Sequence, residues 1–237
     1  NILGGSFEYT GTTNLTSNGT LVSGTQSLIY LKGSLINSTP GSTNVAAVAL
    51  DGWGAGTISG MTANIDGENN GSIALGNSAV GLYGKNGSRL SNKNSINMGD
   101  ASAGLMTSGS GSLALNSGTI IVGTGSQGIY LKDGDYVHNT GSILSTGAGT
   151  VGIYANNTSV HVTNDGNIDL AGDKSIGIYS IGTTSINIIN NSIVKIGNST
   201  NTSDPSIGIY NAVAGSTVKN DGTITSGINS IGIYNNQ

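Results

Sequence analysis

The five residues Ser-Ile-Gly-Ile-Tyr stand at 175–179, 206–210 and 230–234, and this segment decides the fold of the chain. Related segments occur at 79–83, 126–130 and 150–154. The closing position recurs at intervals of 23, 24, 24, 25, 31 and 24 residues along Tyr83, Met106, Tyr130, Tyr154, Tyr179, Tyr210 and Tyr234. SLIY, ending at Tyr30, and AVAL, ending at Leu50, look like weaker early copies. Such a period is typical of a repeat protein, in which each unit packs on its neighbours.

A second pattern runs in step with the first and reads Asn, any residue, Gly or Asn, any residue, Ile. Its members begin at Asn69, Asn92, Asn116, Asn139, Asn164 and Asn220. In one unit the pattern departs, and Ile189 stands where the first Asn is expected. Gly and Asn are the residues that most readily take positive φ. The third position of the pattern is therefore predicted to be a left-handed turn residue, followed by a strand.

Each unit contains three short segments in which apolar residues alternate with polar or small ones, the period of a β-strand. In the unit 150–173 these segments are TVGIYA, SVHVTN and NIDLAG. The sequence predicts an all-β fold, a parallel β-helix with three strands per coil, about 23–25 residues per coil and roughly ten coils. We expect one continuous domain, with irregular coils over 1–68 and regular coils over 69–237. A β-sandwich is the alternative, but it would need hairpin turns and would not keep a strict period.

The alternation also predicts which side chains form columns along the rod. The residues before and after the glycine of the repeated segment are mostly apolar and are expected to face inward, so that the glycine and the tyrosine face outward. Stacked tyrosines would reinforce neighbouring strands; an aromatic stripe that binds sugar or protein is the alternative. The predicted structural columns consist of Tyr83, Tyr130, Tyr154, Tyr179, Tyr210 and Tyr234 on the surface and of Asn116, Asn139, Asn164 and Asn220, whose amides are expected to hydrogen-bond along the rod.

Binding residues are expected where the period fails, because insertions in a repeat protein lie in loops. The longest irregular segment, 51–68, contains Trp53, Asp51, Asp66 and Glu68. Trp53 is predicted either to stack on a ligand or to cap or plug the rod. A second segment, 197–205, contains Asn201 and Asp204, and a third, 37–44, contains Pro40.

The ionisable residues give little support for catalysis or metal binding. Only 8% of residues are charged and the net charge is −4, which argues against a nucleic-acid partner. Asp165 and Asp169 share the outward parity that glycoside hydrolysis would need, but they straddle a corner. Neither a metal nor any other cofactor is predicted, since His138 and His161 lack an evident third ligand. Arg89 stands between Lys85 and Lys93 with no acidic residue among them.

The repeats resemble the passenger regions of large outer-membrane autotransporters (type V secretion), in particular the RadD-like family of fusobacteria. The resemblance rests on Ser-Ile-Gly-Ile-Tyr, on Asn-Asp-Gly-Thr-Ile at 220–224 and on Asn-Thr-Gly-Ser-Ile at 139–143. It covers 69–237 well and 1–68 loosely. The resemblance implies a longer protein with a signal peptide before this region and a membrane β-barrel after it. It also implies export across the outer membrane to the bacterial cell surface and adhesion to other bacteria or host cells.

The function expected from the sequence is that of a surface-displayed adhesin passenger fragment, a β-helical stalk that binds a surface protein or glycan of another bacterium or a host cell. No catalytic residue is predicted and the chain is not expected to be an enzyme. Two alternatives stay open: a polysaccharide-degrading lyase or glycosidase on the same fold, and a purely mechanical spacer.

Overall fold

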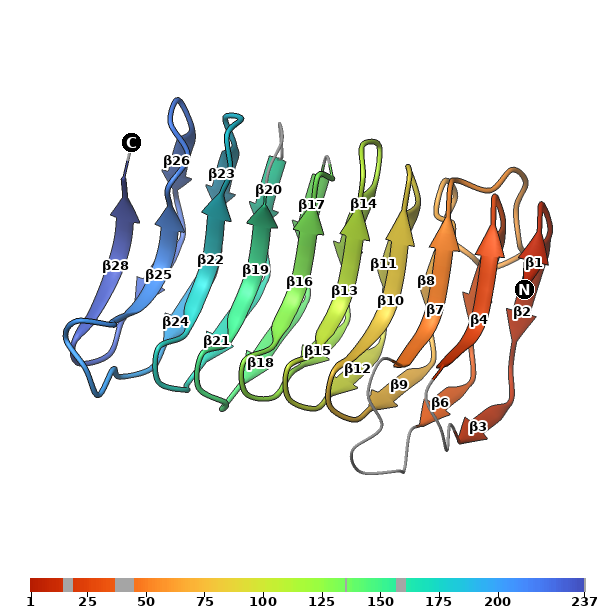
Figure 1. The fold of residues 1–237 in the computed structure, drawn as a ribbon, viewed down its shortest axis with the longest axis horizontal. Helices are drawn as coiled ribbons and strands as arrows, with labels where there is room; N and C mark the ends of the chain where they lie inside the picture. The colour runs from red at the N-terminus through yellow and green to blue at the C-terminus, as the bar shows by residue number, and fades with distance from the viewer. Residues whose placement is uncertain (15–18, 37–44, 135, 157–160, 237) are drawn as a thin grey trace.

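The chain folds into a parallel β-helix, as Figure 1 shows for the computed structural model. The structure describes residues 1–14, 19–36, 45–134, 136–156 and 161–236. All regular elements in these ranges are β-strands, and they form three sheets of ten, nine and nine strands. The N-terminus lies at one end of the rod and the C-terminus near the other (Figure 1). This confirms the predicted all-β fold with three strands per coil.

The first sheet contains one strand from each coil, and six of its strands carry the repeated segment or a close copy of it. Its strands are β1 (Ile2–Leu3), β4 (Gly19–Thr25), β7 (Val45–Asp51), β10 (Ala79–Lys85), β13 (Ala103–Ser108), β16 (Gln127–Lys132), β19 (Val151–Asn156), β22 (Ile176–Ile181), β25 (Ser206–Asn211) and β28 (Ser230–Asn235).

The second and third sheets complete each coil. The second sheet is formed by β2 (Ser6–Tyr9), β5 (Leu28–Leu31), β8 (Gly67–Asn69), β11 (Arg89–Asn92), β14 (Leu113–Asn116), β17 (Tyr136–Asn139), β20 (His161–Asn164), β23 (Asn187–Asn190) and β26 (Thr217–Asn220). The third sheet is formed by β3 (Thr12–Asn14), β6 (Ser34–Ile36), β9 (Ser72–Leu75), β12 (Ser95–Met98), β15 (Thr119–Ile121), β18 (Ser142–Ser145), β21 (Asn167–Leu170), β24 (Ile193–Ile196) and β27 (Thr223–Thr225).

Equivalent residues of successive coils lie side by side, because each strand pairs in parallel with the strands one coil before and after it. Ile129, Ile153, Ile178 and Ile209 are consecutive partners in the first sheet, and all four are fully buried. Adjacent strands are about 4.8 Å apart, so one apolar side chain per strand builds a continuous column. The core is therefore a set of aliphatic columns that run along the axis of the rod.

The repeated segment departs from regular alternation at its glycine. Gly152 and Ile153 are both buried, whereas Val151 before them is only partly buried. A Cβ at Gly152 would lie 2.7 Å from Ile168 Cγ2 and 2.5 Å from the carbonyl oxygen of Gly177. The prediction that the glycine faces outward, between two inward residues, is therefore wrong. The glycine faces the core, where the isoleucine of the third sheet fills the space that a side chain would need.

The glycine of the second pattern also has a different role from the predicted one. Gly118, Gly141 and Gly166 do not take positive φ. A Cβ at Gly118 would instead lie 2.0 Å from the carbonyl oxygen of Asn94 in the preceding coil, and one at Gly141 would lie 2.0 Å from that of Gly118. The prediction of a left-handed turn residue is wrong at these positions, and close approach of adjacent coils explains the glycines.

Three assignments of repeat positions are corrected by the strand register. Asn190, and not Ile189, is the partner of Asn164 and Asn220, so the departing coil does keep its asparagine. Tyr30 lies in β5 of the second sheet and is not an early copy of the repeated segment. Leu50 pairs with Gly84, and the partner of Tyr83 is Ala49. The asparagine and the leucine were misassigned by one residue, whereas Ser23, and not Tyr30, is the first-sheet counterpart of Tyr83 in its coil.

Asparagine amides form an unbroken hydrogen-bonded ladder inside the rod. Each Nδ2 donates to the Oδ1 of the next coil over distances of 2.6–2.8 Å. The ladder consists of Asn69, Asn92, Asn116, Asn139, Asn164, Asn190 and Asn220. Except at the last rung the side chains are buried, so the ladder satisfies polar groups that would otherwise be costly to bury.

Tyrosine rings form a second column, on the outer face of the first sheet. Ring centroids from Tyr130 through Tyr154, Tyr179 and Tyr210 to Tyr234 are 4.9–5.1 Å apart. Met106 separates Tyr83 from this column. Burial, followed by neighbouring tyrosines, raises the pKa of Tyr154 and of Tyr179 above its ordinary value.

Candidate functional site

The long irregular segment forms a loop that covers the outside of the second sheet. Fourteen residues, 52–65, connect Asp51 to Asp66. In the next coil, Lys85 and Arg89 stand at the equivalent positions, and only three residues, 86–88, connect them. All four residues of β5 are buried. Ile29 and Leu31 lie in the core, and the loop covers Leu28 and Tyr30 on the opposite face. Figure 1 shows the loop arching from β7 toward the N-terminal coils.

Tyr30 attaches the middle of this loop to the sheet. Its hydroxyl donates to the carbonyl oxygen of Gly60 at 2.9 Å and accepts from Nδ2 of Asn70 at 2.9 Å. The ring is 2% exposed, so these two contacts satisfy a buried polar group. The sequence offered little signal for this role, because Tyr30 resembled the tyrosine of the repeated segment.

Asp66 attaches the start of the loop and is fully buried. Its Oδ1 accepts from the backbone N–H of Gly54 at 2.9 Å, and its two carboxylate oxygens bind Nη2 and Nε of Arg89 at 2.8 and 3.0 Å. This bidentate contact holds the guanidinium plane in one orientation. Asp66 also raises the pKa of Arg89 above its ordinary value through the hydrogen bond.

Glu68 attaches the end of the loop. It is fully buried, accepts from the backbone N–H of Thr62 at 3.0 Å and lies 3.4 Å from Nζ of Lys93. On the surface beside it, Asp51 lies 3.0 Å from Nζ of Lys85. Hydrogen bonds from Lys85 and Asn86 lower the pKa of Asp51. Lys85, Arg89 and Lys93 have no acidic residue near them in the sequence, but each pairs with an acid of the preceding coil. The pairing becomes visible only when the register of the coils is known.

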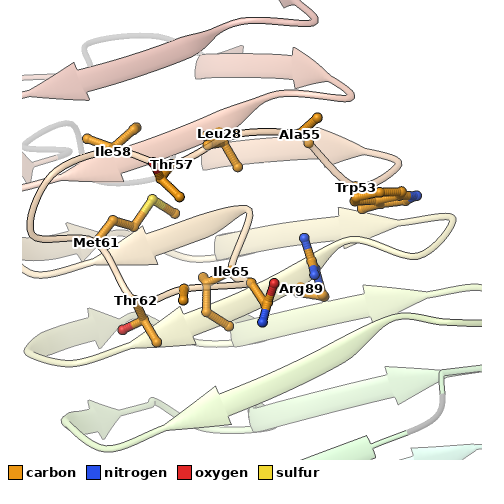
Figure 2. A pocket seen from close by; sticks show the side chains of 13 residues that line it. Leu28, Trp53, Ala55, Thr57, Ile58, Met61, Thr62, Ile65 and Arg89 are labelled. Atoms are coloured by element: carbon orange, nitrogen blue, oxygen red, sulfur yellow. The ribbon is translucent and has the colours of Figure 1, made fainter.

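A pocket of about 210 Å³ lies between the loop and β5. Figure 2 shows Trp53 and Arg89 at one end of it and Ile58 and Met61 at the other. The pocket is lined by Leu28, Trp53, Gly54, Ala55, Gly56, Thr57, Ile58, Met61, Thr62, Ala63, Asn64, Ile65 and Arg89. Thr62 is one of these lining residues, but its Oγ1 is buried beneath the surface of the pocket and has no hydrogen-bond partner.

Trp53 is exposed at the mouth of the pocket. Its side chain is 59% exposed, and the guanidinium carbon of Arg89 lies 5.4 Å from the ring centroid. This is the geometry of a cation–π contact. The prediction that Trp53 caps or plugs the rod is wrong, because the side chain stands on the flank of the rod and leaves most of its surface open. The prediction that it stacks on a ligand stays open.

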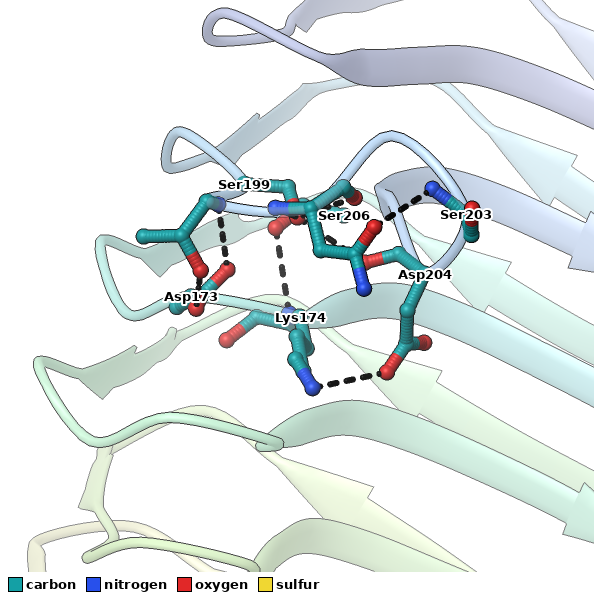
Figure 3. Close-up of polar contacts among 9 residues, drawn as sticks. Asp173, Lys174, Ser199, Ser203, Asp204 and Ser206 are labelled. Atoms are coloured by element: carbon teal, nitrogen blue, oxygen red, sulfur yellow. Dashed lines mark hydrogen bonds and ion pairs between the residues drawn. The ribbon is translucent and has the colours of Figure 1, made fainter.

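The segment 197–205 forms a smaller loop that is fixed by polar contacts (Figure 3). Nζ of Lys174 binds Asp204 at 2.9 Å, and Asp173 accepts from the backbone N–H of Thr200 at 3.0 Å and from its hydroxyl at 2.5 Å. The contacts with Thr200 lower the pKa of Asp173. Asn201 accepts from the backbone N–H of Ser203 within the loop. Both predicted binding residues, Asn201 and Asp204, therefore take part in holding the loop itself.

The acids and histidines considered for catalysis or metal binding are engaged in local contacts. Asp165 binds Asn191 at 2.7 Å and His138 at 2.6 Å, and these hydrogen bonds lower the pKa of Asp165. Asp169 binds Nζ of Lys195 at 3.0 Å. The register pairs His161 with Tyr136 and His138 with Thr163, so the two histidines do not occupy equivalent positions. Among the described residues, no group of three or more candidate ligands is arranged to hold a metal ion.

Two further observations concern the ranges that the structure describes. The third irregular segment, 37–44, lies outside them. The ranges that are described contain no helix of the length and apolar character that a membrane span requires.

Comparison with known proteins gave one result. A family model described as "BigA third pectate lyase-like domain" matches residues 6–230, nearly the whole chain. The comparison with curated proteins gave no significant match, and neither did the comparison with solved structures.

Proposed function

The chain belongs to the family of the BigA third pectate lyase-like domain, and from this membership we propose that it is part of a β-helical stalk that carries adhesive loops on a bacterial cell surface. BigA is an autotransporter-type adhesin, which supports a passenger-like role. The observation that carries the proposal is the continuity of the three sheets from the first coil to the last. A uniform rod of this kind separates a binding loop from the surface to which the rod is attached.

We further propose that the chain is a passenger segment of a RadD-like fusobacterial autotransporter, exported across the outer membrane. Its partner would be a surface protein or glycan of another bacterium or of a host cell. The repeated Ser-Ile-Gly-Ile-Tyr segments support this finer assignment, and the loop over β5 offers a place for binding. Adhesion through loops on a rigid scaffold needs no catalytic group.

The family description contains the words "pectate lyase-like", which favour a test of the enzymatic alternative. Asp165 and Asp169 are the acids to test, Asp165 in the corner between β20 and β21 and Asp169 within β21. Contacts with Asn191 and His138 engage both carboxylate oxygens of Asp165, and Lys195 engages one oxygen of Asp169, so these groups are already bound in local contacts.

The proposal is tested by measuring the binding of the purified, fluorescently labelled chain to a panel of bacterial and epithelial cells. We expect saturable binding to at least one cell type, and competition by excess unlabelled chain. The same preparation is incubated with a panel of polysaccharides. Turnover that is lost in Asp165→Ala or Asp169→Ala would contradict a purely adhesive role, and folded chain that binds no cell would favour the mechanical spacer.

A further inference from the structure

We propose that the pocket under the 52–65 loop binds one neutral sugar ring, with the indole of Trp53 as the surface on which the ring stacks. This inference rests on the proposed adhesive function and deepens it, because it names the ligand class of one loop. The charge, the shape and the polar lining of the pocket support it.

The charges around the pocket cancel, which argues for an uncharged ligand. Every base on this flank has its own acid: Lys85 with Asp51, Arg89 with Asp66 and Lys93 with Glu68, at 3.0, 2.8 and 3.4 Å. An anion would have to compete with a buried carboxylate for Arg89. A cation would approach an indole ring that already faces a guanidinium. Neither sign of charge therefore gains from entering this site.

The mouth of the pocket presents an exposed aromatic ring beside a guanidinium that is held in place. Trp53 is 59% exposed, while Arg89 beside it is fixed by two hydrogen bonds to fully buried Asp66. The face of an indole carries negative charge density, and the C–H groups on one face of a pyranose ring carry partial positive charge. A pyranose ring can therefore stack on the exposed part of the indole, next to a guanidinium that is already ordered by Asp66.

The interior of the pocket fits one ring with hydroxyl groups. Its volume of about 210 Å³ corresponds to roughly seven waters at about 30 Å³ each. Thr62 also lines the pocket, but its Oγ1 is buried beneath the surface of the pocket, so the accessible polar groups come from other residues. Asn64 and Thr57 add polar side chains to a wall otherwise formed by Leu28, Ile58 and other apolar groups. Such a lining, apolar with a few polar groups, is typical of small-ligand sites.

An aromatic side chain of a partner protein is the main competitor for the same surface. It would stack on Trp53 equally well, but it carries at most one polar group, whereas a sugar ring offers several hydroxyls to Thr57 and Asn64. The site thus favours a ligand with one apolar face and several hydroxyls, and the aromatic ligand becomes an outcome of the test.

Trp53 is the only tryptophan of the chain, so its fluorescence reports on this site alone. We would titrate the folded chain with the methyl glycosides of glucose, galactose, mannose and N-acetylglucosamine, and with N-acetylneuraminic acid and phenylalanine amide as probes of the competing chemistries. We expect a saturable change with at least one neutral glycoside, at a dissociation constant of about 1 mM, which is ordinary for a single ring.

Variants are then compared by saturation-transfer NMR, which does not need the indole. Trp53→Ala is expected to weaken the glycoside by at least tenfold, and Thr57→Val by a smaller factor of three or more. Tyr83→Ala, on the outer face of the first sheet, is the matched aromatic control and is expected to leave binding within twofold. Circular dichroism establishes that each variant is folded.

The inference is overturned if no neutral glycoside binds the folded chain, if only the acidic sugar or phenylalanine amide binds, or if Trp53→Ala binds as the parent does. Its failure can be told apart from failure of the proposed function. Saturable cell binding without sugar binding would leave adhesion standing and remove this site. Sugar binding without cell binding would leave the sugar site standing and contradict the proposed adhesive function.

Discussion

The regular coils and the coil with the long loop both bury polar side chains, but they do so in different ways. In the regular coils the buried polar groups are neutral amides and hydroxyls, and each rung of the ladder is satisfied by the same residue one coil away. Under the loop the carboxylates of Asp66 and Glu68 are buried as well. Asp66 accepts from Arg89 and from the Gly54 N–H, whereas Glu68 accepts from the Thr62 N–H and lies 3.4 Å from Nζ of Lys93.

The amide ladder stabilises the rod as a whole, whereas the buried carboxylates hold one loop in place. A repeated amide makes the same kind of contact in every coil and singles out none of them, whereas a buried ion pair is costly to form and therefore restricted to a place that needs it. A functional site is therefore better sought near the buried ion pairs under the 52–65 loop than along the amide ladder. Four variants test this contrast, beginning with the one of largest expected effect.

Replacing a middle rung of the ladder should destabilise the rod most. Asn139→Leu leaves buried Oδ1 of Asn164 without its partner and leaves Nδ2 of Asn116 with only a long contact, 3.4 Å, to the carbonyl oxygen of Ser142. We expect a loss of about 3 kcal/mol or more in the free energy of unfolding, measured by urea titration, because each unsatisfied buried group costs about 1–3 kcal/mol. Asn220→Leu at the exposed last rung is the control, and we expect it to cost less than about 1 kcal/mol. Equal losses at the two rungs would show that the ladder contributes little.

Removing one buried charge should loosen the loop more than it weakens the rod. Asp66→Asn removes the counter-charge of Arg89 and weakens the contact with the Gly54 N–H. We expect a loss of about 2–3 kcal/mol, with faster hydrogen exchange in 52–65. Asp51→Asn disrupts an exposed pair with Lys85 and should cost less than about 1 kcal/mol. Unchanged exchange in the loop of Asp66→Asn would contradict its assigned role.

A methyl group at the buried glycine tests how closely the coils pack. In Gly152→Ala the new Cβ would meet the Gly177 carbonyl oxygen at 2.5 Å, so we expect a loss of about 2 kcal/mol from overpacking. The matched control is Gly232→Ala in the last coil, where the nearest atom would be Ile224 Cγ2 at 3.9 Å. Thermal unfolding should distinguish the two variants. Equal midpoints of unfolding would mean that Gly177 and Ile168 can shift enough to accommodate the methyl group.

The smallest effect concerns an exposed acid beside the ladder. The pKa of Asp165 is lowered, chiefly by the hydrogen bond from Asn191 and then by that from His138. Its contribution to stability is therefore present above the ordinary value of 3.8 and is lost as the pH falls through the lowered pKa. Asn191→Ala should raise this pKa toward 3.8 in a carbon-13 NMR titration.

The same variant should cost about 0.5 kcal/mol or less near neutral pH, because the pair is exposed. The difference from the parent chain should shrink as the pH falls below 3.8. Asn94→Ala removes a surface amide that binds a backbone carbonyl, and it should show no such pH dependence. A gap that stays constant down to pH 2 would contradict the assignment of the lowered pKa to Asn191.

The period of the sequence was sufficient to predict the coil, because every coil repeats the same inward residues. The period was not sufficient to predict the direction in which each side chain points, and Gly152 shows why. Alternation assumes a regular strand, and the strand departs from it where Ile168 of another sheet occupies the space. The partner of Asn164 was misplaced for a related reason, since the spacing within one coil varies while the pairing between coils does not.

The loop site was predicted only in outline. The excess length of 51–68 identified the segment, and the single tryptophan singled out one residue in it. The pairing of Asp66 with Arg89, and the cover over Leu28 and Tyr30, depend on contacts between residues about 23 and 30 positions apart. Sequence reasoning within one coil does not reach such contacts, which arise when one coil is laid on the next.

The amide ladder also makes the rod electrically directional. All six amide–amide bonds point their N–H groups toward the C-terminal end, so their dipoles add head to tail. Neighbouring hydrogen bonds in such a chain polarise one another, and interior rungs are stronger than terminal ones. Oδ1 of Asn69, which has no hydrogen-bond partner, is the negative end of the ladder. The exposed Nδ2 group of Asn220 is its positive end. The ladder is thus expected to fray from its ends while its middle stays intact.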